Sequence, residues 1–142
     1  HRGRRTAIEI SPWARIRAHQ SGMSQLPVID PQALDNLRAL NPGDNDEFLR
    51  ELIGIFLEDT PKRLTELDTS LTAGDAGTFT RAAHSIKGSA ANLGAMQLRT
   101  AAEKLEHHSR KEGLGGVAAM VAAVKAEFDR ARGELNRLTS GQ

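Results

Sequence analysis

Residues 82–94, AAHSIKGSAANLG, lie in a segment whose apolar side chains recur with the spacing of an α-helix. When successive residues are placed about 100° apart on a helical wheel, one side collects Phe79, Ala82, Ile86, Ala90 and Leu93, with Ala83 and Ser89 at its edges. We expect this side to face a core. His84 points almost directly away from it, so the pattern predicts a surface helix that exposes its histidine.

The helical period continues from Asp30 to the end of the chain, where Ala, Leu, Glu, Arg and Lys dominate and Val, Ile and Thr are sparse. Asp30 and Pro31 are typical of a helix start, and Gly74 and Gly94 of helix ends. Amphipathic helices joined by short loops pack as antiparallel neighbours. We therefore predict an all-α fold, an antiparallel up-and-down four-helix bundle with a short additional N-terminal helix. The predicted helices cover residues 31–40, 44–74, 76–92, 95–110 and 117–138.

Two features of the 44–74 segment carry further predictions. Asp44 is followed three residues later by Glu47, the spacing of a capping box at a helix start. Pro61 falls inside the segment, where it is expected to kink the helix or split it in two.

The composition excludes several classes of protein. The chain has no cysteine, which rules out disulfides, thiolate catalysis and cysteine-ligated zinc. Four Phe, one Trp and no Tyr, together with a net charge of +1, argue against nucleic acid as a partner. No apolar run approaches the roughly 20 residues of a membrane span, and the basic start lacks the apolar region of a secretory signal. We expect a cytoplasmic protein that does not insert into membranes.

Residues 1–30 differ from the rest, with five arginines against two acidic residues and little periodicity. We interpret them as a basic N-terminal tail, linker or expression-derived segment, and residues 31–139 as the bundle. A basic arm that touches a membrane or nucleic acid is the alternative for the first segment.

The face around His84 combines three features. Lys87 lies one turn on, and Gly88 lies directly beside the histidine at the i+4 position. Glycine in a helix interior costs about 1 kcal/mol relative to alanine, so its presence favours a surface that must stay clear for a partner. Neutral imidazole is a nucleophile, and a cation suits phosphoryl transfer. The residues expected to dock a partner around it are Thr80, Arg81, Ala91 and Asn92.

This face lacks the other parts of an enzyme site. The helix offers no carboxylate or second histidine to act as a base, and the chain has no GxxxxGK[ST] loop and no acidic metal-binding loop. His107 and His108 are adjacent and cannot clamp one metal as an i, i+4 pair can; we interpret them as solvated, with a metal site as the alternative. A partner would have to bring the metal and the phosphoryl donor.

The run from His84 to Gly94 resembles the signature H-x-[IL]-K-G-[SA]-[SA]-x-x-[LIV]-G of histidine-containing phosphotransfer (HPt) domains, and FLEDTPKRLTEL upstream is similar to their second helix. The resemblance covers about residues 31–139. It implies a four-helix bundle in which His84 is phosphorylated, Lys87 neutralises the phosphoryl charge and Gly88 lets a receiver domain approach. It also implies that the receiver brings the magnesium. Where some members have a glutamine on the next helix, this chain has Glu106, which could accept from the imidazole N–H but would repel a phosphoryl group.

The prediction is a phosphoryl carrier without a kinase site, most simply a monomer, that exchanges phosphate with response-regulator receivers and a hybrid sensor histidine kinase. The alternatives are a docking bundle in which His84 has no transfer role, and a free-standing kinase or phosphatase, which the missing nucleotide motif disfavours. Basic residues on or after the helix next to that of His84 are interpreted as solvated charges, of which one or two contact an acidic receiver face: Arg99, Lys104, Arg110 and Lys111.

Overall fold

Five α-helices and no strand make up the part of the chain that the computed structural model describes, residues 27–140. The helices are α2 (Pro31–Arg38), α3 (Glu47–Ala73), α4 (Ala76–Asn92), α5 (Met96–Glu112) and α6 (Ala118–Ser140). Every helix predicted from the sequence is present, with ends that differ by a few residues. The predicted basic segment lies outside the described residues as far as position 26.

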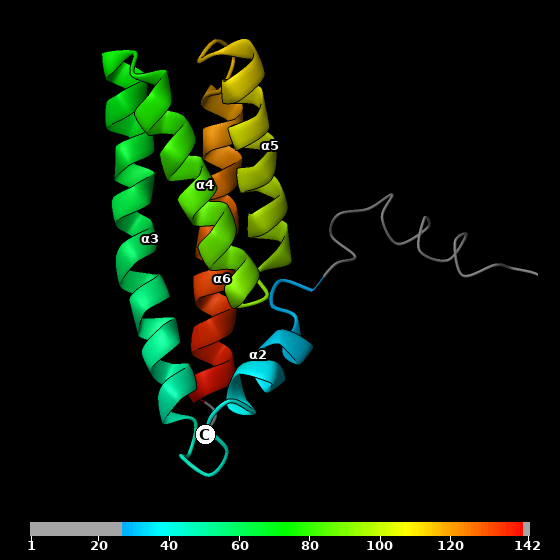
Figure 1. Cartoon of the computed structure of the whole chain (residues 1–142). Helices are drawn as coiled ribbons and strands as arrows, with labels where there is room; N and C mark the ends of the chain where they lie inside the picture. The colour runs from blue at the N-terminus through cyan, green and yellow to red at the C-terminus, as the bar shows by residue number, and fades with distance from the viewer. Residues whose placement is uncertain (1–26, 141–142) are drawn as a thin grey trace, which may run out of the picture.

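Helices α3, α4, α5 and α6 lie side by side as a bundle, and the short α2 lies across one end (Figure 1). Helix α4 packs against both α3 and α5, and α6 packs against α5 and α3. Short loops join successive helices of the bundle, so neighbours run in opposite directions. The architecture is the predicted all-α four-helix bundle with a short additional N-terminal helix.

One apolar core runs through the bundle and contains the predicted stripe of α4, with Phe79 and Ala90 fully buried and Ile86 nearly so. The rings of Phe56 in α3 and Phe128 in α6 lie with centroids 5.6 Å apart and join these two helices. Ile29 also belongs to the core, so packing begins before the predicted boundary at residue 31. The core side chains of α5 and α6, and of the loop between them, include Leu98, Ala102, Leu105, Val117, Val121, Val124, Ala131 and Leu135.

The loop after α4 fastens α2 to the bundle. Gly94 has a φ of +73°, a conformation that residues with a side chain rarely adopt. Its carbonyl oxygen accepts a hydrogen bond from the Asp30 amide at 2.8 Å, and the Asp30 carboxylate in turn caps α2 by accepting from Gln32 N–H at 3.0 Å. A Cβ on Gly94 would lie 2.6 Å from the Cβ of Ala33. Glycine is therefore required here both for the turn and for the close approach of α2.

Gly94→Ala is expected to lower the free energy of unfolding by about 3 kcal/mol, because it combines strained backbone with a steric clash. Gly74→Ala is the matched control. Gly74 has the same φ of +73°, but a Cβ there would meet nothing within 4 Å, so we expect a loss of only about 1 kcal/mol. Urea unfolding measures both. An equal loss in the two variants would show that the contact with α2 adds nothing.

Helix α3 is one continuous helix of 27 residues with Pro61 inside it, so of the two predicted outcomes, a kink or a split, the split is wrong. Pro61 lies on an exposed side of the helix. There, water can bond to the carbonyl oxygen that loses its amide donor, which makes the interruption tolerable. Thr65 Oγ1 also donates to the Pro61 carbonyl at 3.1 Å.

The start of α3 differs from the predicted capping box. The residue that precedes the helix is Asp46, with a φ of +66° and no side-chain cap. The Asp44 carboxylate accepts from the amide of Phe48 at 3.1 Å, not from that of Glu47. Asp46 instead pairs with Arg38 Nε of α2 at 3.2 Å, which links the two helices.

Candidate functional site

The outer face of α4 presents His84 to solvent, with 63% of its side chain exposed. An added Cβ on Gly88 would meet nothing within 4 Å, and Ala91 is exposed one turn further on. The exposed histidine, with small residues beside it, is the arrangement that the helical wheel predicts. A second molecule can therefore reach the imidazole ring without meeting a side chain at position 88.

Glu106 of α5 contacts the imidazole ring of His84 at Nδ1. Its carboxylate is buried, with 4% of the side chain exposed, and Oε2 lies 2.9 Å from His84 Nδ1. Oε2 also accepts from Nη2 of Arg110 at 2.7 Å. Lys87 Nζ lies 2.9 Å from Oε1, but Oε1 takes no hydrogen bond of good geometry, so this contact is an ion pair. The buried carboxylate thus joins the histidine to two cations.

These contacts keep Glu106 ionised. Burial acts to raise the pKa of its carboxyl group, but the contacts with Lys87, Arg110 and His84 outweigh it and lower the pKa to about 2. At neutral pH the carboxylate can only accept hydrogen bonds. The proton of a neutral His84 ring therefore lies on Nδ1, and the lone pair is on Nε2, on the side of the ring away from Glu106. Glu106 orients the ring and fixes its tautomer.

The low pKa of Glu106 predicts that acid destabilises the fold. The pKa is about 2 in the folded chain against an ordinary 4.5, so the stabilisation is complete above pH 4.5 and is lost as the pH falls towards 2. Between neutral pH and about pH 3, the free energy of unfolding should fall by about 2 kcal/mol from this group. Urea unfolding of the wild type and of Glu106→Gln measures it. The variant should lack this part of the pH dependence, and an unchanged slope would contradict its assignment to Glu106.

The predicted docking residues divide between the two edges of the α4 face. Ala91 and Asn92 are exposed, and so is Arg81, whose Nη2 donates to Thr78 Oγ1 at 3.3 Å. Thr80 is half-buried, and its hydroxyl lies 2.7 Å from Ser109 Oγ of α5. Thr80 therefore contributes to the packing of α4 on α5 and offers little surface to a partner.

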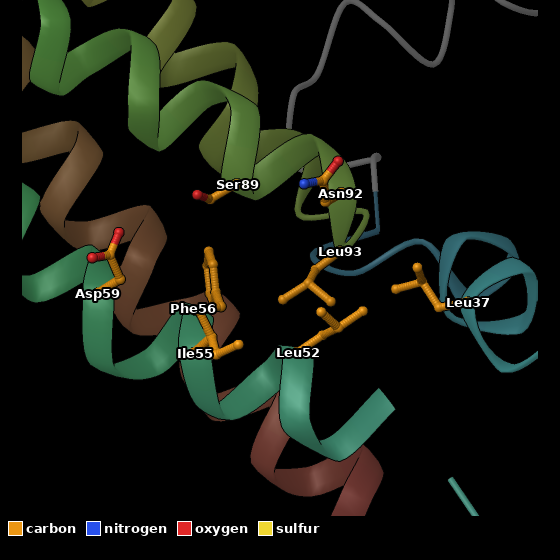
Figure 2. Close-up of a pocket in the computed structure, with 8 residues that line it drawn as sticks. All are labelled: Leu37, Leu52, Ile55, Phe56, Asp59, Ser89, Asn92 and Leu93. Carbon is orange, nitrogen blue, oxygen red and sulfur yellow. The ribbon is translucent and has the colours of Figure 1, made fainter. Parts of the chain in front are cut away.

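An apolar groove lies on the α3 side of this face. It runs between α2, α3 and the end of α4, with Ser89 and Asn92 on one wall and Ile55 on the other (Figure 2). Ile55 is a large apolar side chain that is 61% exposed. The helical pattern does not predict this groove, and its one signal in the sequence is Ile55, an apolar residue that lies off the apolar stripe of its helix. The remaining lining residues are Leu37, Leu52, Phe56, Asp59 and Leu93.

The other candidate residues do not assemble into a second site. His107 is exposed, and Nε2 of His108 lies 2.8 Å from the carbonyl oxygen of Gly115 in the loop after α5. Within residues 27–140, no group of three or more His, Cys, Asp or Glu side chains is placed to hold a metal ion. Of the four basic residues predicted as solvated charges, Arg110 contacts the His84 cluster. The sequence contains a signal for it, since Arg110 follows Glu106 at the i+4 spacing.

None of the described helices is both long enough and apolar enough to span a membrane.

Comparison with known proteins finds a related sequence and several related structures. The chain is 26% identical over 90 residues to multistep phosphorelay regulator 1 of Schizosaccharomyces pombe, a match over 63% of this chain and 30% of that protein. The chain thus spans less than a third of the length of this relative.

Solved structures share the fold. Histidine-containing phosphotransfer protein B of Pseudomonas aeruginosa PAO1 superposes with a TM-score of 0.73 at 29% identity, over 82% of this chain and 97% of that one. The phosphotransfer protein MtHPt2 of Medicago truncatula gives 0.72 at 21% identity, over 92% of this chain and 90% of that one, which is a likeness of fold. The family model of the Hpt domain matches residues 51–134, which include the whole of α4 and α5. The chain therefore belongs to the Hpt domain family, the domains of histidine phosphotransfer in phosphorelays.

Proposed function

We propose that the chain carries a phosphoryl group on His84 and passes it between aspartates of receiver domains in a multistep phosphorelay. The placement of His84 is the observation that carries the proposal. Its ring is exposed, its Nδ1 is bound to a buried carboxylate, and a glycine clears the surface beside it. Membership of the Hpt family and the likeness to a phosphorelay regulator support the same function.

The transfer step follows from the tautomer of His84. The Nε2 lone pair forms the N–P bond while the P–O bond of an aspartyl phosphate breaks, and the electrons of that bond leave with the aspartate carboxylate. The Nδ1 proton stays in its hydrogen bond to Glu106, so the positive charge of the phosphorylated ring faces a carboxylate. Delivery to the next receiver reverses the step. Glu106 accepts the same hydrogen bond throughout and does not act as the base.

The partners in this proposal are a receiver domain of a hybrid sensor histidine kinase as donor and a response-regulator receiver as acceptor. Each would cover His84, Gly88 and Asn92 and extend over the apolar groove that Asn92 lines. We assign the Mg²⁺ of the reaction to the receiver and the cation Lys87 to this chain. We further propose that the chain works as a monomer in the cytoplasm and has no kinase site of its own.

Incubation with a panel of phosphorylated receiver domains tests the proposal, alongside incubation with ATP alone. We expect at least one receiver to give an acid-labile, alkali-stable label, as a phosphohistidine does, and ATP alone to give none. Label from ATP alone would contradict the absence of a kinase site. A folded protein that binds receivers but takes label from none would instead be a docking module without phosphotransfer.

A further inference from the structure

Glu106 creates a charge problem for the function proposed above, on which this inference rests. A phosphoryl group on His84 brings a charge of about −2 to a ring whose other nitrogen lies 2.9 Å from a carboxylate. The carboxylate is buried, so solvent screens it poorly. Lys87 alone cannot balance both anions, because its ammonium group already lies 2.9 Å from Glu106 Oε1.

Arg110 is the second cation of the cluster. It and His84 contact the same carboxylate oxygen, Oε2 of Glu106, at 2.7 Å and 2.9 Å. With a neutral imidazole, Lys87, Arg110 and Glu106 together leave one net positive charge. A site with Glu106 and a single cation would be neutral before the phosphoryl group arrived.

The packing of α4 on α5 places the positions of Lys87 and Arg110 on opposite sides of His84 along the helix axes. Glu106 lies opposite His84, and Ser109 lies opposite Thr80, as the contact between their hydroxyl groups shows. Arg110 therefore lies on the side of His84 nearer the start of α4, whereas Lys87 lies on the side nearer the end of α4. The two cations therefore reach the Glu106 carboxylate from opposite directions along the helix axes, Lys87 at Oε1 and Arg110 at Oε2.

The side chain of Arg110 is also the more available of the two. It is 63% exposed, whereas that of Lys87 is 25% exposed. Within the described residues, its guanidinium makes one hydrogen bond, to Glu106, and so retains donors for another acceptor. A guanidinium presents several N–H groups in a plane, which suits two oxygens of a phosphoryl group.

We propose that Arg110 is a second phosphoryl-binding cation. This chain needs it because the carboxylate of Glu106 lies 2.9 Å from the His84 ring. When His84 is phosphorylated, Arg110 donates to the phosphoryl oxygens and offsets the charge of Glu106. The requirement for Arg110 is therefore conditional: it depends on the negative charge at position 106.

A double-mutant cycle tests this condition. Transfer from a phosphorylated receiver is measured for the wild type, Arg110→Gln, Glu106→Gln and the double variant. We expect Arg110→Gln to slow transfer about tenfold when Glu106 is present and less than about twofold when glutamine occupies position 106. An equal loss in both backgrounds would show that Arg110 acts independently of Glu106 and would overturn the conditional role. No loss in either background would overturn the proposal outright.

A chemical donor separates phosphoryl binding from receiver docking. His84 is phosphorylated with phosphoramidate, and the phosphoryl pKa is measured by phosphorus NMR. Loss of Arg110 should raise that pKa by about one unit, because a nearby cation favours the dianion. Arg130→Gln is the matched control, because Arg130 is exposed on α6 and pairs with Glu127 at 3.2 Å, outside the His84 cluster; it should change the pKa little.

The outcomes also separate this inference from the proposed function. A wild-type chain in which neither the receivers nor phosphoramidate label His84 would contradict the proposed function itself. A wild type that is labelled normally, with the same phosphoryl pKa in Arg110→Gln, would contradict the role of Arg110 alone. Circular dichroism confirms that each variant is folded before either result is used.

Discussion

His84→Gln is expected to abolish phosphorylation of the chain while leaving the fold intact. The amide of glutamine has no nucleophilic lone pair comparable with that of imidazole, so transfer from a phosphorylated receiver should slow by at least about a thousandfold. The replacement retains an N–H group that can donate to Glu106, and the site is largely exposed. The free energy of unfolding should therefore change by no more than about 0.5 kcal/mol.

His107→Gln is the matched control for this experiment, because His107 is an exposed histidine on the neighbouring helix α5. It should keep wild-type label and wild-type transfer rates. Receiver binding should survive in His84→Gln, since the docking surface is unchanged. Suppose that His84→Gln took a normal amount of acid-labile label and His107→Gln took none. The phosphorylated residue would then be His107 of α5, and our assignment would be refuted.

The sequence predicts the helices and the exposure of His84 because both follow from local chemistry. Apolar residues at helical spacing must be buried on one side, which fixes the opposite side as well. Gly94 is predicted to end its helix, and the structure adds a second reason for glycine there, the close approach of Ala33 from α2. Local chemistry does not decide whether Pro61 ends its helix, because a proline within a long helix is tolerated when the surrounding structure holds the two halves together.

The contacts of Glu106 with His84, Lys87 and Arg110 are harder to predict from the sequence, because they depend on the packing of α4 on α5. A wheel gives the direction of each side chain from its own axis but not the register between α4 and α5. That register brings Glu106 to His84 and Ser109 to Thr80. The first contact is expected only through resemblance to the family. The second has no signal in the sequence, which is why Thr80 is assigned there to a partner.

Gly88→Glu is expected to reduce transfer about a hundredfold and to stabilise the fold. A glutamate at this position lies beside His84 at the i+4 spacing, where it blocks the approach of a receiver and repels its aspartyl phosphate. Because nothing lies within 4 Å of an added Cβ, the fold loses no contact and gains helix propensity of about 0.5 kcal/mol.

Gly133→Glu is the matched control, since Gly133 is exposed within α6 and an added Cβ there also meets nothing within 4 Å. It makes the same chemical change on a different helix, so it should give a similar gain in stability at normal transfer rates. Thermal unfolding and transfer from a phosphorylated receiver are measured for both. If Gly88→Glu transferred as fast as Gly133→Glu, the surface beside His84 would not be a docking surface. Slow transfer by a Gly88→Glu variant that is more stable than the wild type would show two effects of glycine at position 88. It lowers the stability of the fold, and it keeps the imidazole of His84 accessible to a receiver.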